Sequence, residues 1–241
     1  MTCGGYNGGM IDITFDMFSD SPPGMDPDSY SPTLQRYHKL LWSKPLPSGK
    51  PFALSDSTPG AYLHHQSDVG GFFLSSDAIT HSYVGTKAMI PLLKQLPPGT
   101  NAILFEDCST IGAYTLFPAN RINGKMTING ARGMSAKIKD RFDLTLECIR
   151  RHYTDEDSPL AEVLQRYSAF FDLFETFEGY VDFFLFQDLV ADDCGSVKFY
   201  LPFDNFERPA LPQDADEYIA YRELTLSFVA ARNERIKDAT T

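Results

Sequence analysis

Alternating apolar and polar residues predict short strands in the first half of the chain. Ile11, Ile13 and Phe15 alternate with polar residues, which is the pattern of a half-buried strand. The Asn123-Gly124 dipeptide favours a hairpin turn between two further strands. The other strands predicted from these patterns cover residues 61–64, 71–75, 102–105, 113–117 and 126–128.

Apolar residues at helical spacing predict helices, most of them in the second half. Ser31-Pro32 is typical of a helix start, because serine caps the first turn and proline suits the first helical position. Ser158-Pro159 begins the clearest apolar stripe, which we expect to end at Gly179. The stripe consists of Leu160, Val163, Leu164, Tyr167, Phe171 and Phe174. Further predictions are helices at residues 86–95, 138–153, 180–190 and 214–236, and a late strand at residues 197–203.

The distribution of these elements predicts an α+β fold. Strands concentrate in the N-terminal half and helices in the C-terminal half, which argues against an alternating βαβ arrangement. We expect a mixed or antiparallel sheet from the N-terminal half, packed with helices from the C-terminal half. These elements would form one domain over residues 10–241, after a flexible glycine-rich tail at residues 1–9.

The acidic composition narrows the expected partners. The chain has 21 Lys and Arg residues against 32 Asp and Glu residues, which gives a net charge of −11. Such a charge repels nucleic acids and anionic membrane surfaces, so we expect neither as a partner. No signal peptide is visible and no apolar stretch is long enough for a membrane span, which predicts a cytoplasmic protein.

The sequence lacks several common catalytic motifs. It contains no phosphate-binding P-loop, no Rossmann glycine fingerprint, no HExxH zinc motif and no GxSxG nucleophile elbow. Arg232-Asn233 resembles the start of the Arg–Asn–x–His signature of HEPN-type ribonucleases, but the last histidine of the chain is His152. Because the signature is incomplete, we interpret Arg232 and Asn233 as a solvated helix end.

His65, Asp68 and His81 form one candidate metal set. Two histidines and a carboxylate are a recurrent ligand combination for divalent metals. His64 cannot join His65 in such a site, because neighbouring residues on a strand point to opposite faces. The alternative is that one of these two histidines lies on the strand surface and the other is a core residue bonded to the backbone. We expect this alternative, and with it no metal or other cofactor.

The densest basic segment, residues 120–151, is a candidate anion site. Gly130 and Gly133 precede Ser135, which we interpret as the N-cap of a helix. Free N–H groups at a helix start favour anions, and arginine side chains add charge-assisted donors. The predicted site, for a nucleotide or phosphorylated metabolite, consists of Asn129, Arg132, Ser135 and Arg141.

A structural role is the alternative for the same segment. Arg132 would then bond carbonyl groups or Asp140 and close the loop. The basic residues of the following helix would form ion pairs on an exposed face, because residues four positions apart are neighbours there. The expected pairs are Lys139–Asp143 and Glu147–Arg151.

Two stretches of the chain are similar to a known family. Residues 26–49 and 127–153, the latter continuing into residues 179–190, resemble an uncharacterised bacterial protein family. The resemblance extends over most of the chain beyond the first ten residues and implies a bacterial, cytosolic protein. It assigns no activity, so no catalytic residue carries over.

The sequence therefore leaves three functions open. The first is binding, with or without catalysis, of a small anionic ligand at the predicted site. The second is a protein-interaction module, in which the aromatic residues of segment 180–186 face a partner. The third is a metal-dependent hydrolase that uses His65, Asp68 and His81.

We predict that all four cysteines are free thiols. Cys3, Cys108, Cys148 and Cys194 are widely spaced, and a chain of this size forms its core without disulfide bonds. Thiol titration under denaturing, non-reducing conditions should count four groups. A count of two or none would contradict the prediction.

Overall fold

The computed structural model describes residues 11–100 and 109–240 and places a three-stranded antiparallel sheet at the centre. Its strands, in spatial order, are β3 (Leu63–Ser67), β4 (Gly70–Ala78) and β5 (Tyr114–Pro118). A second antiparallel pair joins β1 (Lys44–Pro45) to β2 (Pro51–Phe52). The predicted α+β class is confirmed, and all of these strands come from the N-terminal half.

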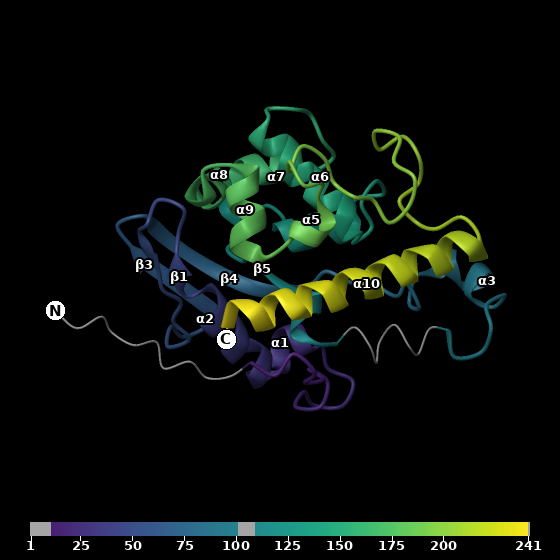
Figure 1. Cartoon of the computed structure of the whole chain (residues 1–241), viewed down its shortest axis with the longest axis horizontal. Helices are drawn as coiled ribbons and strands as arrows, with labels where there is room; N and C mark the ends of the chain where they lie inside the picture. The colour runs from purple at the N-terminus through teal and green to yellow at the C-terminus, as the bar shows by residue number, and fades with distance from the viewer. Residues whose placement is uncertain (1–10, 101–108, 241) are drawn as a thin grey trace.

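Helices surround this sheet (Figure 1). The short α1 (Pro27–Tyr30) contacts β4 and precedes α2 (Pro32–Trp42). On the other side of β4 and β5 lie α5 (Ile128–Met134), α6 (Phe142–Tyr153), α7 (Ala161–Arg166), α8 (Ser168–Phe171) and α9 (Phe177–Phe184). The remaining elements are α3 (Ile90–Leu93), α10 (Ala215–Thr240) and the short 3-10 turns η1 (Lys87–Met89), η2 (Ile111–Ala113), η3 (Ile122–Gly124), η4 (Asp172–Phe174) and η5 (Gln187–Leu189).

Several predicted elements are confirmed with small shifts of their ends. The strands expected at residues 61–64, 71–75 and 113–117 correspond to β3, β4 and β5. Ser31 caps α2 as expected, because its side chain accepts a hydrogen bond from the Leu34 N–H. The final helix is also present, and its start is fixed by Asp214, whose carboxylate accepts a hydrogen bond from the Glu217 N–H.

The aromatic stripe predicted after Ser158 is buried, but it does not form one helix. The stripe residues all lie in the core. The chain breaks at Glu175, whose φ of 65° ends η4, and α9 begins again after Thr176. Gly179 is therefore inside α9 rather than at a helix end. A Cβ atom there would lie 2.1 Å from the Phe174 carbonyl oxygen, so only glycine permits this close approach.

The strands predicted at residues 11–15 and 197–203 are absent. At residues 11–15 the Asp12 carboxylate accepts hydrogen bonds from both the N–H and the hydroxyl of Thr14, which turns the chain. At residues 197–203 only one isolated bridge, between Val190 and Val197, is formed.

The prediction of a hairpin at Asn123-Gly124 is also wrong. Both residues have positive φ, as a turn of this type requires, but no strand follows. Instead, the Thr127 side chain accepts a hydrogen bond from the Gly130 N–H and starts α5. The turn at Asn123-Gly124 is therefore present, but a helix follows it where the sequence predicts a strand.

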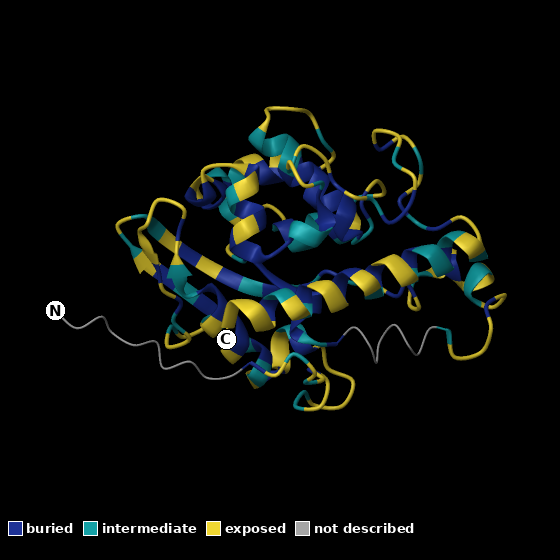
Figure 2. Ribbon diagram, in the orientation of Figure 1, coloured by how far each residue is buried: buried dark blue, intermediate teal, exposed yellow. Residues whose placement is uncertain are grey.

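The aromatic segment 180–186 lies in the core and not on a partner-facing surface. Tyr180 and Phe186 are fully buried, and Phe184 packs against Phe174 and the Trp42 ring. Figure 2 shows the same burial for α6, which is covered from Phe142 to Ile149. This finding removes the surface on which the interaction hypothesis rested.

Arg232 is fully buried, so the prediction of a solvated helix end is wrong. Its guanidinium group donates to the carbonyl oxygens of Phe184, Gly112 and Tyr114 at 2.8–2.9 Å, with a longer Nε contact to Phe184 at 3.3 Å. The group also lies 4.5 Å from the centroid of the Phe186 ring. Among the described residues it forms no ion pair. Burial lowers the pKa of Arg232 to about 9.

Asn233, the next residue of α10, also holds this helix against η2. Its side-chain oxygen accepts the Gly112 N–H at 2.8 Å, and its amide group donates to the Thr110 hydroxyl at 2.7 Å. A Cβ on Gly112 would lie 2.6 Å from that oxygen, so glycine is required for α10 to pack on η2. The Arg-Asn pair is therefore a structural clamp.

Some predictions fall outside the described residues. These are the flexible tail at 1–9, the strand at 102–105 and the thiols of Cys3 and Cys108. Cys148 and Cys194 are free, as predicted. Even the 26-residue α10 lacks the apolar length that a bilayer crossing needs, as does every other helix in the described residues.

We predict that Arg232→Met lowers the free energy of unfolding by about 3 kcal/mol, because three buried carbonyl groups lose their donor. Arg235→Met is the matched control, since Arg235 lies one turn further on and its pair with Asp188 is partly exposed. That control should cost no more than about 1 kcal/mol. Urea unfolding measures both values. Equal losses of unfolding free energy in the two variants would contradict this role of Arg232.

Candidate functional site

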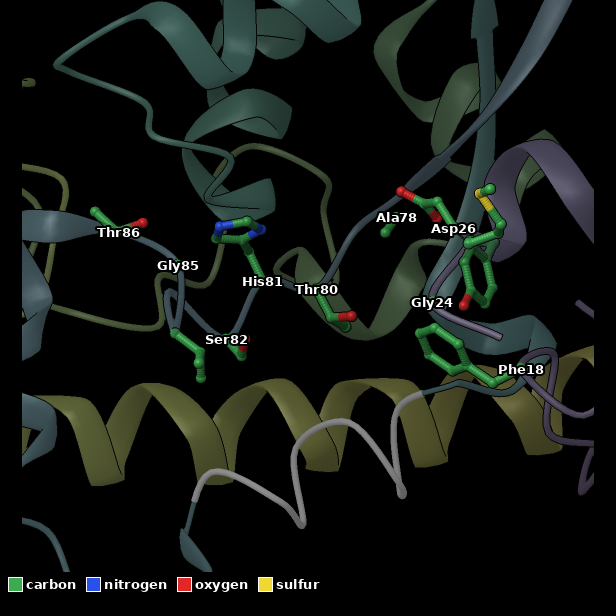
Figure 3. A pocket seen from close by; sticks show the side chains of 12 residues that line it. Phe18, Gly24, Asp26, Ala78, Thr80, His81, Ser82, Gly85 and Thr86 are labelled. Atoms are coloured by element: carbon green, nitrogen blue, oxygen red, sulfur yellow. The ribbon is translucent and has the colours of Figure 1, made fainter. Parts of the chain in front are cut away.

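A large cavity lies between the loop that leads into α1 and the segment that follows β4. Its volume is about 610 Å³. Figure 3 shows Phe18 and Asp26 on one side and Ser82 and Thr86 on the other, with Thr80 between them. The remaining lining residues are Gly24, Met25, Ala78, His81, Val84, Gly85 and Tyr114. We call this cavity the α1 cleft.

Apolar side chains form part of the rim of the α1 cleft. Phe18, Met25 and Val84 have exposed fractions of 43%, 45% and 45%. Such exposure is unfavourable for a large apolar side chain, and here three of them surround one concave surface. The rim can therefore cover the apolar body of a ligand.

The polar lining of the α1 cleft is acidic or neutral. Asp26 contributes a carboxylate, and Thr80, Ser82 and Thr86 contribute hydroxyl groups. Within the described part of the chain, no lysine or arginine lines the cleft. The cleft therefore offers hydrogen bonds and negative charge.

A buried chain of hydrogen bonds ends beside this cleft. Trp42 donates its indole N–H to His38 Nδ1 at 3.0 Å, and His38 Nε2 contacts the Ser76 hydroxyl at 3.0 Å. Ser76 donates to Asp28 Oδ1 at 3.0 Å, and the Ala78 N–H donates to Asp28 Oδ2 at 3.0 Å. We call the four side chains of this chain the α1 relay.

The direction of the α1 relay is fixed by its first member. Indole is only a donor, so His38 Nδ1 must accept and Nε2 must carry the proton. The hydroxyl of Ser76 then accepts from His38 and donates to Asp28. His38 is fully buried, and burial with the nearby charge of Arg232 lowers its pKa to about 3, which keeps the imidazole neutral.

Asp28 is the group through which the relay meets the cleft. Asp28 follows Asp26 by two residues and accepts a hydrogen bond from the Ala78 N–H. Asp26 and Ala78 both line the α1 cleft. Burial and the neighbouring charge of Asp26 together raise the pKa of Asp28 to about 7, against the hydrogen bonds from Ser76 and Ala78. A carboxyl group with this pKa exchanges its proton near neutral pH, as general acids and bases do.

The residues of the predicted anion site have partners within the chain. Arg132 is fully buried and pairs with Asp77, and its Nε donates to the Thr145 hydroxyl at 3.0 Å. Its Nη2 also donates to the Asp140 carbonyl oxygen at 3.3 Å. These contacts support the structural alternative, in which Arg132 closes the loop. An anion would have to displace Asp77 from the guanidinium group.

Asn129, Ser135 and Arg141 are placed in different surroundings. Asn129 donates weakly to Ser75 and Ser76 at 3.4 Å, and its buried Oδ1 has no hydrogen-bond partner in the described residues. Ser135 ends α5 as its C-cap, so the N-cap prediction is wrong and Gly130 and Gly133 are helical. The glycines therefore form no loop before a helix start.

Arg141 and its neighbours form a buried ion pair. Arg141 binds the Asp143 carboxylate with two nitrogens, at 3.1 Å and 2.5 Å, and donates to the Ala210 carbonyl oxygen. Asp143 therefore pairs with Arg141, whereas the sequence predicts a pair with Lys139. The predicted Glu147–Arg151 pair is confirmed at 2.8 Å, although Glu147 is buried rather than exposed.

The three candidate metal ligands do not form a metal site. The described residues contain no group of three or more His, Cys, Asp or Glu side chains that could hold a metal ion. His65 bonds the Ala53 carbonyl and the Ser67 hydroxyl, as the core alternative expects. Asp68 pairs with Lys50 at 3.4 Å, and His81 lines the α1 cleft.

Sequence reasoning missed the α1 relay. Asp28 lies in a turn-rich stretch and Ser76 near the end of a strand, and nothing in either local pattern indicates that they meet 48 residues apart. His38 and Trp42 offered a weaker signal, because residues four apart on a helix are neighbours.

Comparison with known proteins identifies a family for the chain. The model of a family of unknown function (DUF6994) matches residues 11–236. No curated protein and no solved structure matches the chain.

We predict that Asp28→Asn gains stability relative to the wild type as the pH rises. A carboxyl with a folded pKa of about 7 and an ordinary unfolded value of 3.8 ionises first in the unfolded chain. The wild type therefore loses stability between about pH 4 and pH 7, whereas the amide does not titrate. The difference in Tm should increase by about 5–10 °C from pH 5 to pH 8.

Thermal unfolding at four pH values measures this difference. Asp68→Asn is the control, because the Asp68 side chain is 74% exposed and its variant should keep a constant offset. A constant offset for Asp28→Asn as well would contradict the raised pKa of Asp28.

Proposed function

The chain belongs to the DUF6994 family, whose function is unknown, and we propose that it binds a small neutral or cationic organic molecule in the α1 cleft. The single observation that carries this proposal is the composition of the cleft. An apolar rim of Phe18, Met25 and Val84 stands over a lining that has Asp26, His81 and hydroxyl groups but, in the described residues, no lysine or arginine.

The size of the α1 cleft suits a small molecule. Ligand cavities measure about 300–1,000 Å³, and the cleft measures about 610 Å³. Sites of this kind combine an apolar surface with a few polar groups that fix the orientation of the ligand. Phe18 and Asp26 supply one group of each kind on the same side of the cleft.

Charge favours a cation or a neutral molecule over an anion. Asp26 lies in the lining and Asp28 directly behind it, in a protein with a net charge of −11. An ammonium group that binds near Asp26 gains Coulomb energy of about 1 kcal/mol even at the dielectric constant of water. The same field repels phosphate and carboxylate groups.

Asp28 gives the cleft a group that can accept a proton from a bound ligand. The α1 relay holds its carboxylate from one side through Ser76, and the Ala78 N–H holds it from the other. A ligand with an ammonium group would stabilise the ionised form of Asp28 and lower its pKa. Ligand binding and proton release would then be coupled.

The test uses two matched probes, phenethylamine and 3-phenylpropionate, which share an aromatic body and differ in charge. We expect the amine to bind with a millimolar Kd, measured by titration of NMR chemical shifts. Asp26→Asn should weaken this binding about fivefold, which corresponds to about 1 kcal/mol. Phe18→Ala should also weaken it, because the rim loses its aromatic contact.

The control and the alternatives are part of the same experiment. Asp56→Asn removes an acidic side chain that pairs with Lys39 and does not line the cleft, so it should leave amine binding unchanged. Inorganic phosphate tests the anion hypothesis for Asn129, Arg132, Ser135 and Arg141. Binding of phosphate or of the carboxylate, without binding of the amine, would overturn the proposal.

A further inference from the structure

Lys44 occupies an unusual environment for a lysine, away from the α1 cleft. Its Nζ lies 4.6 Å from the centroid of the Phe183 ring and 5.1 Å from that of Trp42. Within the described residues this nitrogen has no hydrogen bond and no ion pair. Four other lysines form ion pairs with carboxylates, namely Lys39, Lys50, Lys125 and Lys237.

A cavity of about 360 Å³ opens beside this amine. It lies between β1 with the turn after it and α9, and its walls are mostly apolar. Asp182 is the one carboxylate among the described lining residues. The lining consists of Lys44, Pro45, Leu46, Pro47, Gly179, Asp182 and Phe183. We call this cavity the Lys44 cavity.

The charges around Lys44 favour the neutral amine. Burial and the positive charge of Arg232 on α10 together lower the pKa of Lys44 to about 8. Asp182 on α9 acts in the opposite direction. At pH 7.5 about a quarter of the amine is then neutral, whereas a lysine with the ordinary pKa of about 10.4 is neutral in about one molecule in a thousand.

We propose that Lys44 is a nucleophilic amine that captures small carbonyl compounds, aldehydes above all, as imines in the Lys44 cavity. Three geometric features support this role. The amine faces aromatic rings instead of a counterion, it opens onto a cavity, and a carboxylate able to move protons lines the same cavity. Enzymes activate lysines by the same combination of an apolar pocket and a neighbouring cation.

The reaction balances without an oxidant or a cofactor. The lone pair of neutral Nζ attacks the carbonyl carbon, a C–N bond forms, and the carbonyl oxygen takes one proton to give a carbinolamine. The C–O bond then breaks as the oxygen takes a second proton and leaves as water, while nitrogen forms the C=N bond. Both protons come from the amine nitrogen, and Asp182 is placed to carry them to the oxygen.

A purely structural role for Lys44 is the competing interpretation. A cation over two aromatic rings stabilises a fold by itself, without any chemistry. The two interpretations differ in reactivity, because a structural cation stays protonated and does not attack a carbonyl group. They also differ in the effect of Lys44→Arg, which keeps a cation over the rings but removes the nucleophile.

The experiment exposes the full chain to benzaldehyde at pH 7.5 with sodium cyanoborohydride, which reduces each imine to a stable amine. Peptide mass spectrometry then gives the labelling rate of every lysine. Lys44 should react at least about tenfold faster than the exposed Lys87 and Lys94. Its rate should increase with pH to a midpoint near 8. Labelling of Lys44 at or below the rate of the two controls would overturn the proposal.

Two variants complete the test. Lys44→Arg should lose this fast label while keeping its urea midpoint, and a fast label that persists would overturn the assignment to Lys44. Asp182→Asn should slow imine formation severalfold but leave acylation by an N-hydroxysuccinimide ester unslowed, because acylation requires only the neutral amine. Unchanged imine formation in this variant would overturn the proton route through Asp182. Neither readout involves the α1 cleft.

Discussion

The buried guanidinium group of Arg232 is the interaction on which the rest of the structure depends. It donates to carbonyl oxygens at the end of α9 and in the continuous segment formed by η2 and the start of β5, two parts of the chain that are far apart in sequence. The hydrogen bonds compensate the loss of water, but no carboxylate of the described residues compensates the charge. A positive charge in the core therefore acts on every titratable group near it.

The positive charge of Arg232 affects both proposed sites. Arg232 helps to keep His38 neutral, and a neutral His38 is what lets the α1 relay run in one direction to Asp28. Arg232 also favours the neutral amine of Lys44, next to the Trp42 ring that both cations approach. One buried arginine thus couples the position of α10 to the protonation of His38 in the α1 relay and of Lys44 in the Lys44 cavity.

Local chemistry in the sequence predicts much of the fold but little of the site. The Ser31 cap, the apolar stripe after Ser158 and the three main strands depend on neighbours within a few residues, so their patterns are visible in the chain. The bond between Ser76 and Asp28 depends on packing α1 against β4, and no local pattern encodes it. Arg232 was misjudged for the same reason, since a charge near a helix end usually faces water.

The excess of acidic residues explains why the two buried arginines of the basic segment 120–151 have carboxylate partners. The chain has 32 acidic and 21 basic residues, and the buried Arg132 and Arg141, unlike Arg232, pair with the carboxylates of Asp77 and Asp143. Paired groups have little capacity left for a ligand, because displacing a buried partner leaves its charge without compensation. We then expect chemistry at two exceptions. One is a carboxyl group whose pKa burial raises toward neutral pH, and the other is an amine that faces aromatic rings instead of a carboxylate. Asp28 and Lys44 are those exceptions. Lys44 lines a cavity, and Asp28 adjoins Asp26 and Ala78, which line another.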